Sequence, residues 1–207
     1  MLTHPKLSGR HVALEPLAPD WIDDLLKAAG DRSTFGYTFV PADRSSMETY
    51  VAALLADHRE GRAVPFVQRA LMLDGSPIVG CTRFMDIRYH FGRRAGDEPL
   101  PDEVEIGGTW LSSAAQRTGV NTEAKLLLLR HAFEVWGVQR VAICTDERNE
   151  QSRRAIERIG ARFEGVLRNH RPSTAPDERG RLRNTAVHSI TADDWPVVES
   201  RLLGLVR

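Results

Sequence analysis

The sequence has few residues that can crosslink the fold or hold a metal ion. Its 207 residues include only two cysteines, Cys81 and Cys144, and both lie in apolar segments that are typical of strands. We therefore expect two buried free thiols rather than a disulfide or a redox pair, and a cytoplasmic location. The seven histidines form no cluster with the spacing of metal ligands, so no zinc site is expected.

The chain also lacks an excess of either charge and lacks long hydrophobic runs. Its 28 lysine and arginine residues balance 28 aspartate and glutamate residues, so general binding to nucleic acid is not expected. A net charge of zero is still compatible with local basic patches. No apolar run approaches the ~20 residues of a membrane-spanning helix, and residues 1–6 contain no apolar core of a signal peptide. We therefore expect neither nucleic acid nor a membrane among the partners.

The composition that is present is that of a globular protein, with 42% hydrophobic and 27% charged residues. A chain of this length can bury a full core, so we expect one domain over residues 1–207. Hydrophobic periodicity and turn residues predict strands at 11–17, 64–73, 78–87, 103–111, 138–145, 162–169 and 185–191. They predict five helices, at about 20–29, 46–59, 121–136, 150–159 and 193–203. Ser45 or Ser46 is the predicted cap of the second helix, and Asn149 is the predicted cap of the fourth. The long connection over residues 89–102 is a candidate rim or lid segment.

The most informative segment is residues 116–125, which joins the predicted strand 103–111 to a strongly apolar helix. The first turn of a helix has backbone N–H groups without intrahelical partners, and the helix dipole adds about half a positive charge there. Gly119 has no side chain to keep a phosphate away from these donors. The segment therefore predicts a pyrophosphate site of a cofactor, with contacts from Gln116, Arg117, Thr118, Gly119, Val120, Asn121 and Thr122.

Five segments, in this order and spacing, resemble one protein family. They are residues 7–17, residues 105–111 with the turn that follows, and residues 149–161, 164–168 and 183–190. Together they are similar to the GCN5-related N-acetyltransferases, specifically to the branch of ribosomal-protein alanine N-acetyltransferases and their bacterial relatives. The resemblance implies an α/β (α+β) fold: a mixed, largely antiparallel central sheet of about seven strands, with helices on both faces and the fourth and fifth strands splayed.

The same resemblance implies acetyl-CoA as cofactor and transfer of an acetyl group to a primary amine. The pyrophosphate loop of the family is Gln/Arg-x-x-Gly-x-Gly/Ala, and Gln116, Gly119 and Asn121 occupy its three fixed places. Asn121 departs from the small residue that is usual there. We expect its side chain to cap the helix, or else its backbone to approach the coenzyme less closely.

The resemblance also places the pantetheine arm beside the predicted strand 103–111. Gly107 and Gly108 interrupt this strand and predict a bulge or a close approach of a ligand. A backbone N–H freed between Thr109 and Leu111 is expected to polarise the thioester oxygen. Trp110 and Leu111 are therefore counted among the cofactor contacts, and an ordinary twist defect is the alternative.

Amine acetylation also needs a base and a proton for the leaving thiolate. Glu105 is the candidate base; the alternative is a rim glutamate that is paired with an arginine, with Glu103 as the fallback base. Asn149 and Ser152 are expected to contact pantetheine at the start of a helix. Ile156 stands where many relatives carry a tyrosine acid, so the proton is expected from Ser152, from water or from a tyrosine elsewhere.

Several alternatives stay open at this point. Neither cysteine lies in an electropositive turn, so we expect direct transfer in a ternary complex rather than an acyl-enzyme. A non-catalytic acyl-CoA sensor and an antibiotic- or amino-acid-modifying acetyltransferase are the rival hypotheses. An acidic, enclosed acceptor pocket favours a cationic small molecule, and an open groove favours a peptide N-terminus. A homodimer is compatible with the sequence.

Overall fold

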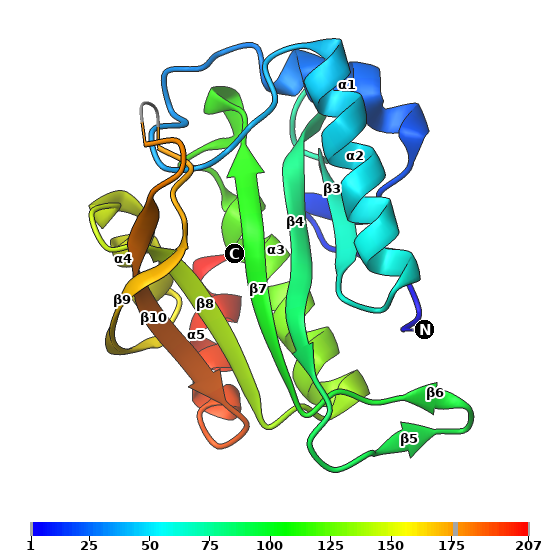
Figure 1. Ribbon diagram of the computed structural model, residues 1–207. Helices are drawn as coiled ribbons and strands as arrows, with labels where there is room; N and C mark the ends of the chain where they lie inside the picture. Colours follow the sequence, from blue (N-terminus) through cyan, green and yellow to red (C-terminus); the bar gives the residue numbers. More distant parts are fainter. Residues whose placement is uncertain (1, 176–177, 207) are drawn as a thin grey trace.

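The computed structural model describes residues 2–175 and 178–206, and its centre is an eight-stranded sheet (Figure 1). The strands of this sheet are β1 (Leu7–Ser8), β2 (Val12–Pro16), β3 (Val64–Ala70), β4 (Ile78–Arg88), β7 (Glu103–Leu111), β8 (Arg140–Asp146), β9 (Arg162–Pro172) and β10 (Leu182–Thr191). Their spatial order is β1-β2-β3-β4-β7-β8-β10-β9. Of the strand pairs described, β7–β8 is parallel and the others are antiparallel. The predicted fold class is confirmed, and the eighth strand is the two-residue β1.

Helices cover both faces of the sheet. On one face lie α1 (Ile22–Ala28), which follows a 3₁₀ turn at Pro19–Trp21, and α2 (Arg44–Arg59). On the other lie α3 (Gly119–Arg130), which continues as a π-helical turn at His131–Trp136, and α5 (Trp195–Leu205). Helix α4 (Glu150–Arg158) lies beside β8 and β10. In Figure 1, α1 and α2 lie over β3 and the adjoining side of β4, whereas no helix lies in front of β7, β8 and β10.

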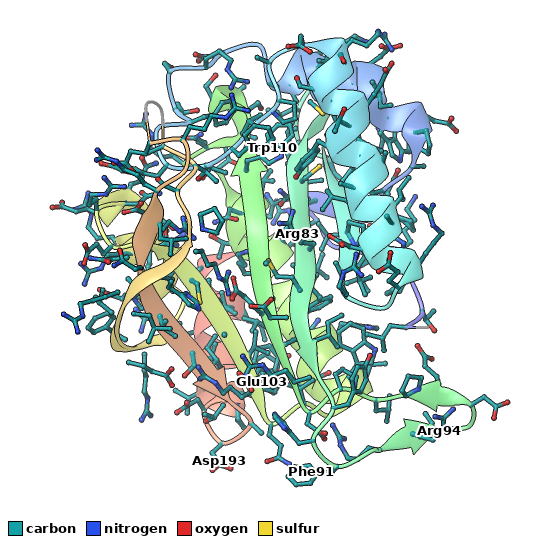
Figure 2. All side chains as sticks on the ribbon, viewed as in Figure 1. Arg83, Phe91, Arg94, Glu103, Trp110 and Asp193 are labelled. Atoms are coloured by element: carbon teal, nitrogen blue, oxygen red, sulfur yellow. The ribbon has the colours of Figure 1, made fainter. Side chains whose placement is uncertain are left out.

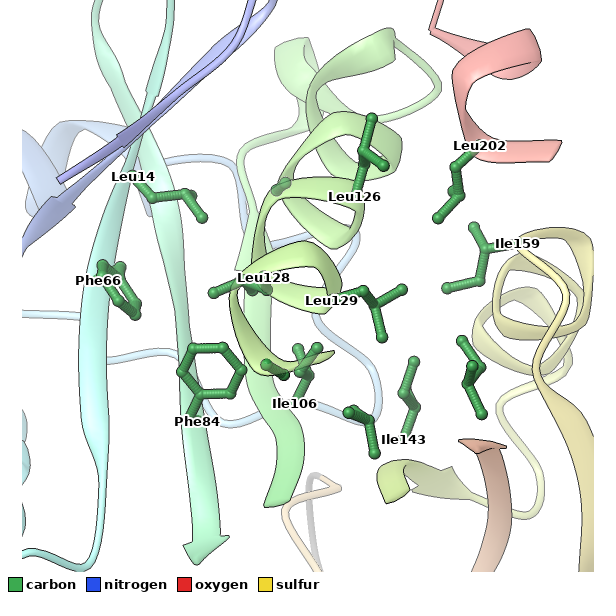
Figure 3. Close-up of a cluster of buried hydrophobic side chains, with 14 of the residues drawn as sticks. Leu14, Phe66, Phe84, Ile106, Leu126, Leu128, Leu129, Ile143, Ile159 and Leu202 are labelled. Carbon is green, nitrogen blue, oxygen red and sulfur yellow. The ribbon is translucent and has the colours of Figure 1, made fainter. Parts of the chain in front are cut away.

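Two hydrophobic cores hold these layers together. The larger core lies between the sheet and α3, where Phe84 and Ile106 meet Leu128 and Leu129 (Figure 3). Both of these leucines are fully buried, and each burial stabilises the fold by about 2 kcal/mol. The smaller core packs α1 and α2 against the opposite face of the sheet. No helix in the described part of the chain is both long enough and apolar enough to cross a membrane.

Capping residues decide where two of the helices begin. Asp43 caps α2 with a capping box, in which its Oδ1 accepts from the Ser46 N–H at 2.8 Å and the Ser46 Oγ accepts from the Asp43 N–H at 3.2 Å. The predicted cap at Ser45 or Ser46 is therefore wrong, because the aspartate just before them takes that position. Asn149 caps α4 as predicted, since its Oδ1 accepts from the Ser152 N–H at 3.1 Å.

The long connection over residues 89–102 is not a lid over the predicted cofactor turn. It contains a small hairpin, β5 (Arg94–Ala95) and β6 (Glu98–Pro99), which projects from the end of the sheet where β7 begins (Figure 1). The cofactor turn follows the other end of β7. The buried Asp102 carboxylate organises the connection, because it accepts hydrogen bonds from the Phe91 N–H and from the Arg93 Nε.

Strands β7 and β8 separate along their length. They pair at only three described positions, the last of which is Glu105 with Ala142. On its other side β7 carries a bulge: Arg83 of β4 pairs with Gly107, but Cys81 pairs with Trp110, so β7 contains one extra residue. Gly108 takes a left-handed φ of 56° in this bulge, and a Cβ there would lie 2.4 Å from the Arg83 Nη1. The predicted splay and the predicted bulge are both confirmed.

Candidate active site

A cleft of about 1080 Å³ opens where β7 and β8 part. Its walls come from β4, β7 and β8, the turn before α3, the N-terminal half of α3, helix α4, the end of β9 and the start of β10. The residues predicted from sequence that line it are Glu105, Trp110, Leu111, Gln116, Arg117, Thr118, Gly119, Asn121, Thr122, Asn149 and Ser152. Val120 does not line it, because its side chain is buried in the core under α3. The chain therefore brings together predicted residues from four separate elements.

The turn before α3 is held by local hydrogen bonds. The Thr118 hydroxyl caps the helix, since it accepts from the Val120 N–H at 3.3 Å and donates to the Ala115 carbonyl at 2.7 Å. Asn121 is the third helical residue, so the expectation that it caps the helix is wrong: Thr118 already occupies that position. The Asn121 Oδ1 is buried and has no hydrogen-bond partner among the described residues. It is an unsatisfied acceptor in the wall of the cleft.

Gly119 has a structural role that the sequence did not indicate. A Cβ at this position would lie 2.9 Å from the ring of His11, which packs against the start of α3. Arg117, two residues earlier, has a left-handed φ of 58°, a conformation that residues other than glycine rarely adopt. The turn therefore combines a glycine that gives room to His11 with a strained arginine that is exposed at the mouth of the cleft.

Helix α4 contributes both predicted and unpredicted residues. Ser152 lies at its start and Ile156, which is buried, one turn further along. Arg154 lines the cleft, as does Arg158, which donates from Nη2 to the Thr122 hydroxyl at 2.9 Å. Arg153 does not line it, because its guanidinium lies over the Phe163 ring. The only signal for Arg158 in the sequence was its position one helical turn after Arg154.

Glu105 is buried, with 4% of its surface exposed, and it lies beside the point where the strands part. Its two carboxylate oxygens accept from Nη1 and Nη2 of Arg171 at 2.8 and 2.7 Å. Arg171 also donates to Asp86 at 2.6 Å, and the Glu105 carboxylate raises the pKa of this arginine. Glu105 is therefore paired with an arginine, but within the cleft and not at a rim. The fallback base, Glu103, pairs with Arg140 and does not line the cleft.

Lys125 of α3 is a site residue that the sequence analysis missed. It lines the cleft with 6% of its surface exposed, and its Nζ donates to the Thr109 hydroxyl at 2.9 Å. Thr109 in turn shares a hydrogen bond with Thr82 at 2.8 Å. Burial lowers the pKa of Lys125 to about 7, and the charge of Glu105 offsets part of that effect. The available signal was a lysine directly before the apolar run at residues 126–129.

The two cysteines differ in their surroundings. Cys81 is a buried free thiol, as expected, whereas Cys144 is partly exposed and lines the cleft. The expectation of two buried thiols is wrong for Cys144, because β8 is no longer paired with β7 at this position. Burial, reinforced by the charge of Glu105, raises the pKa of Cys144 to about 12. This thiol is therefore protonated at neutral pH and is a weak nucleophile.

Aromatic residues close the cleft on the side of the loop between α1 and α2. Phe35, Tyr37 and Phe39 line it, whereas Trp21 packs against the guanidinium of Arg69. Tyr50 of α2 also lines it, and burial raises the pKa of its phenol. The cleft therefore has an aromatic wall in addition to the polar turn at the start of α3.

Known proteins share both this sequence pattern and this fold. A family model described as "Acetyltransferase (GNAT) domain" matches residues 11–162. The "Putative ribosomal N-acetyltransferase YdaF" of Bacillus subtilis (strain 168) is 30% identical over 133 residues, which cover 64% of this chain and 66% of that protein. The alignment thus spans just under two thirds of the length of that relative.

Two solved structures extend the comparison. A GCN5-related N-acetyltransferase from Brucella melitensis superposes with a TM-score of 0.82 at 25% identity, over 100% of this chain and 87% of that one. RimJ of Mycobacterium smegmatis, solved in complex with CoA-disulfide, shares the fold with a TM-score of 0.75 at 22% identity, over 98% and 94% of the two chains. Because the family model matches most of its length, the chain belongs to the GNAT family of acetyltransferases.

Proposed function

We propose that the protein transfers the acetyl group of acetyl-CoA directly to a primary amine, in a complex that holds both substrates. The observation that carries this proposal is the continuous cleft from the start of α3, past the separation of β7 and β8, to Glu105. Acyl-CoA use has further support from the family match and from the RimJ structure, which contains a CoA derivative. We further propose that residues 1–207 act as one domain, since one sheet carries both cores.

The residues at the start of α3 fit the diphosphate of coenzyme A. The first N–H groups of this helix have no intrahelical acceptor, and the helix dipole favours an anion there. Arg117, Arg154 and Arg158 line the same part of the cleft and can pair with phosphate oxygens. The unsatisfied Oδ1 of Asn121 is an acceptor for an N–H group of the ligand. These groups bind and orient the coenzyme.

When it is bound, acetyl-CoA supplies an activated acetyl group as a thioester. Glu105 is the proposed base: its carboxylate takes a proton from the acceptor ammonium, directly or through a water molecule. Arg171 holds this buried carboxylate in place through both of its oxygens. The neutral amine then forms the new C–N bond while the C–S bond breaks, and the nitrogen releases a second proton, which replaces the one that the leaving thiolate takes up.

The leaving thiolate needs a proton, and Ser152 is the proposed donor at the start of α4. Ile156, one turn later, has no hydrogen to give, and the other hydroxyl donors in the cleft include Tyr37 and Tyr50. The backbone of β7 between Thr109 and Leu111 is proposed to face the thioester oxygen. Cys144 is not proposed as an acyl carrier, because its thiol is protonated at neutral pH.

The test is a thiol-release assay with acetyl-CoA against N-terminal peptides, amino acids, polyamines and aminoglycosides, run beside calorimetry with coenzyme A. Binding together with turnover supports the proposal. Binding without turnover of any amine would instead identify an acyl-CoA sensor. Absence of binding would contradict the cofactor site itself.

A further inference from the structure

The charges in the cleft are strongly one-sided. Glu105 is the single acidic residue among the described residues that line it. The basic residues that line it are Arg83, Arg117, Lys125, Arg154, Arg158, Arg171 and Arg183. Three of these arginines belong to the phosphate end around α3 and α4. The others come from β4, α3, β9 and β10, so a positive excess remains around Glu105, at the end where the acceptor amine must enter.

Arg183 makes no direct ion pair with any residue in the described structure. It lies directly opposite Arg171 in the β9–β10 ladder, and like charges in such a pair repel each other. Arg171 is already neutralised by Glu105 and Asp86. Asp146 and Glu105 attract Arg183 without forming an ion pair with it. The Asp146 oxygens accept hydrogen bonds from Arg148, and those of Glu105 accept from Arg171. Arg183 therefore faces the cleft with a buried Nε that has no partner among the residues described.

Arg83 is the second cation of this kind. It lies in the middle of β4, next to β7 (Figure 2), where Tyr50 of α2 contacts it. Its guanidinium packs on the Gly108 bulge, and it makes no ion pair in the described part of the chain. The absence of a side chain at Gly108 makes room for this arginine, since a Cβ there would meet the guanidinium.

Unpaired and partly buried guanidinium groups are costly, and proteins usually pair them with an anion. We propose that the acceptor amine carries a carboxylate or a phosphate, which Arg183 and Arg83 bind while its ammonium group faces Glu105. The acceptor class is then an amino acid, an acidic peptide N-terminus or a phosphorylated amine. A polycationic acceptor such as an aminoglycoside does not match this charge distribution. This inference rests on the proposed acetyl transfer.

The first test measures anion binding without any turnover. Coenzyme A is added to saturation to fill the phosphate end, and the melting temperature is followed as inorganic phosphate or succinate replaces chloride at constant ionic strength. We expect stabilisation of the wild-type protein that is lost in Arg183→Gln and in Arg83→Gln. The exposed Arg201→Gln on α5 is the matched control and should behave as the wild type.

The second test compares acceptors that differ only in the anion: peptides that begin Ala-Asp or Ala-Asn, and phosphoethanolamine or ethanolamine. Rates are corrected for the neutral fraction of each amine. The anionic member of at least one pair should show kcat/KM about 10- to 100-fold higher, in line with charge-assisted hydrogen bonds. Arg183→Gln should remove most of this preference and leave the rate with the neutral member within about 3-fold.

Three outcomes are distinguishable. Loss of coenzyme A binding would contradict the proposed function as a whole. Turnover with equal rates for both members of every pair would overturn only the anionic acceptor. If no amine in the panel reacts, the melting experiment decides: an anion shift that is absent, or that persists in Arg183→Gln and Arg83→Gln, would overturn it as well.

Discussion

The carboxylate of Glu105 on β7 accepts both of its hydrogen bonds from one guanidinium group, that of Arg171 on β9. The two residues are 66 positions apart in the sequence, and their pair lies in the wall of the cleft, where the acceptor amine is proposed to bind. Glu105 is thus buried close to the proposed reaction. The first prediction concerns the role of this carboxylate.

Glu105→Gln should lower kcat at neutral pH by ~10²-fold or more, because an amide cannot take the proton of the acceptor amine. The affinity for acetyl-CoA should stay nearly unchanged, since the phosphate end of the cleft is formed by other residues. Stopped-flow kinetics under conditions where chemistry limits the rate, together with calorimetry, measures both quantities.

Glu103→Gln is the matched control for this experiment. Glu103 lies on the same strand, away from Trp110 and outside the cleft (Figure 2), so its amide variant should keep kcat within about 2-fold of wild type. An unaltered kcat in Glu105→Gln, or an equal loss in both variants, would remove Glu105 from the role of base.

The second prediction separates two roles of Gly119. A methyl group at this position meets the His11 ring, so Gly119→Ala should destabilise the protein by about 1–3 kcal/mol, as overpacking does elsewhere. It should also weaken coenzyme A binding if a phosphate approaches the backbone closely. Chemical denaturation and calorimetry report the two effects separately.

The double variant His11→Ala/Gly119→Ala decides between these roles, with His11→Ala alone as its reference. Removal of the ring gives room to the new methyl group, so stability should recover to that of the reference. Affinity for coenzyme A should remain at least about 10-fold weaker. If the double variant binds coenzyme A as well as His11→Ala does, Gly119 is needed only to give room to the His11 ring. The proposed phosphate site at the start of α3 would then be wrong.

The third prediction concerns Asn149, which lines the cleft and caps α4 through its Oδ1, so that its amide N–H groups remain as candidate donors to the coenzyme. Serine caps helices as well as asparagine does but lacks these donors. The free energy of unfolding of Asn149→Ser should therefore lie within about 0.5 kcal/mol of that of the wild type. The dissociation constant of coenzyme A should rise about 5-fold, which is the effect of one lost hydrogen bond.

Asn149→Ala is the comparison variant, because it loses the cap as well. It should be destabilised by about 1 kcal/mol and bind coenzyme A as weakly as Asn149→Ser. Should the serine variant bind coenzyme A like the wild type, Asn149 would be a helix cap without contact to the ligand.

Local patterns predicted much of this fold and site. Residues 103–111 form β7 with the predicted bounds because alternation and the glycine pair are local signals. The cap at Asn149 and the bulge at Gly108 follow from single-residue preferences. What the sequence left open depends on contacts between distant segments. The bidentate partner of Glu105, and the His11 ring that requires a glycine at position 119, arise only when separate strands and helices meet.

Two errors have the same origin. Asn121 was a reasonable cap by residue type, but the chain already supplied Thr118 at the position where the helix begins. Cys144 has the apolar neighbours of a core strand, but its exposure depends on the separation of β8 from β7, which no residue of β8 encodes by itself. Periodicity describes one element, whereas burial depends on the elements beside it.

The last prediction uses Lys125, whose pKa falls from 10.5 to about 7 because it is buried. In the unfolded chain this lysine keeps its proton up to about pH 10.5, so between pH 7 and that value the unfolded state binds one more proton than the folded state. The free energy of unfolding must then rise with pH, by up to about 1.4 kcal/mol per pH unit. Below pH 7 both states are charged and the contribution of Lys125 no longer changes.

Lys125→Met should remove this contribution. Between pH 7 and pH 9 its free energy of unfolding should increase by about 2 kcal/mol less than that of the wild type, as measured by urea denaturation at a series of pH values. The comparison cancels the two thiols, which titrate in the unfolded chain over the same range in both proteins. Lys27→Met, at an exposed lysine of α1, is the control and should follow the wild type. Parallel curves for wild type and Lys125→Met would show that the buried amine keeps its proton and lies in a more polar environment than its contacts with Thr109 and the apolar helix imply.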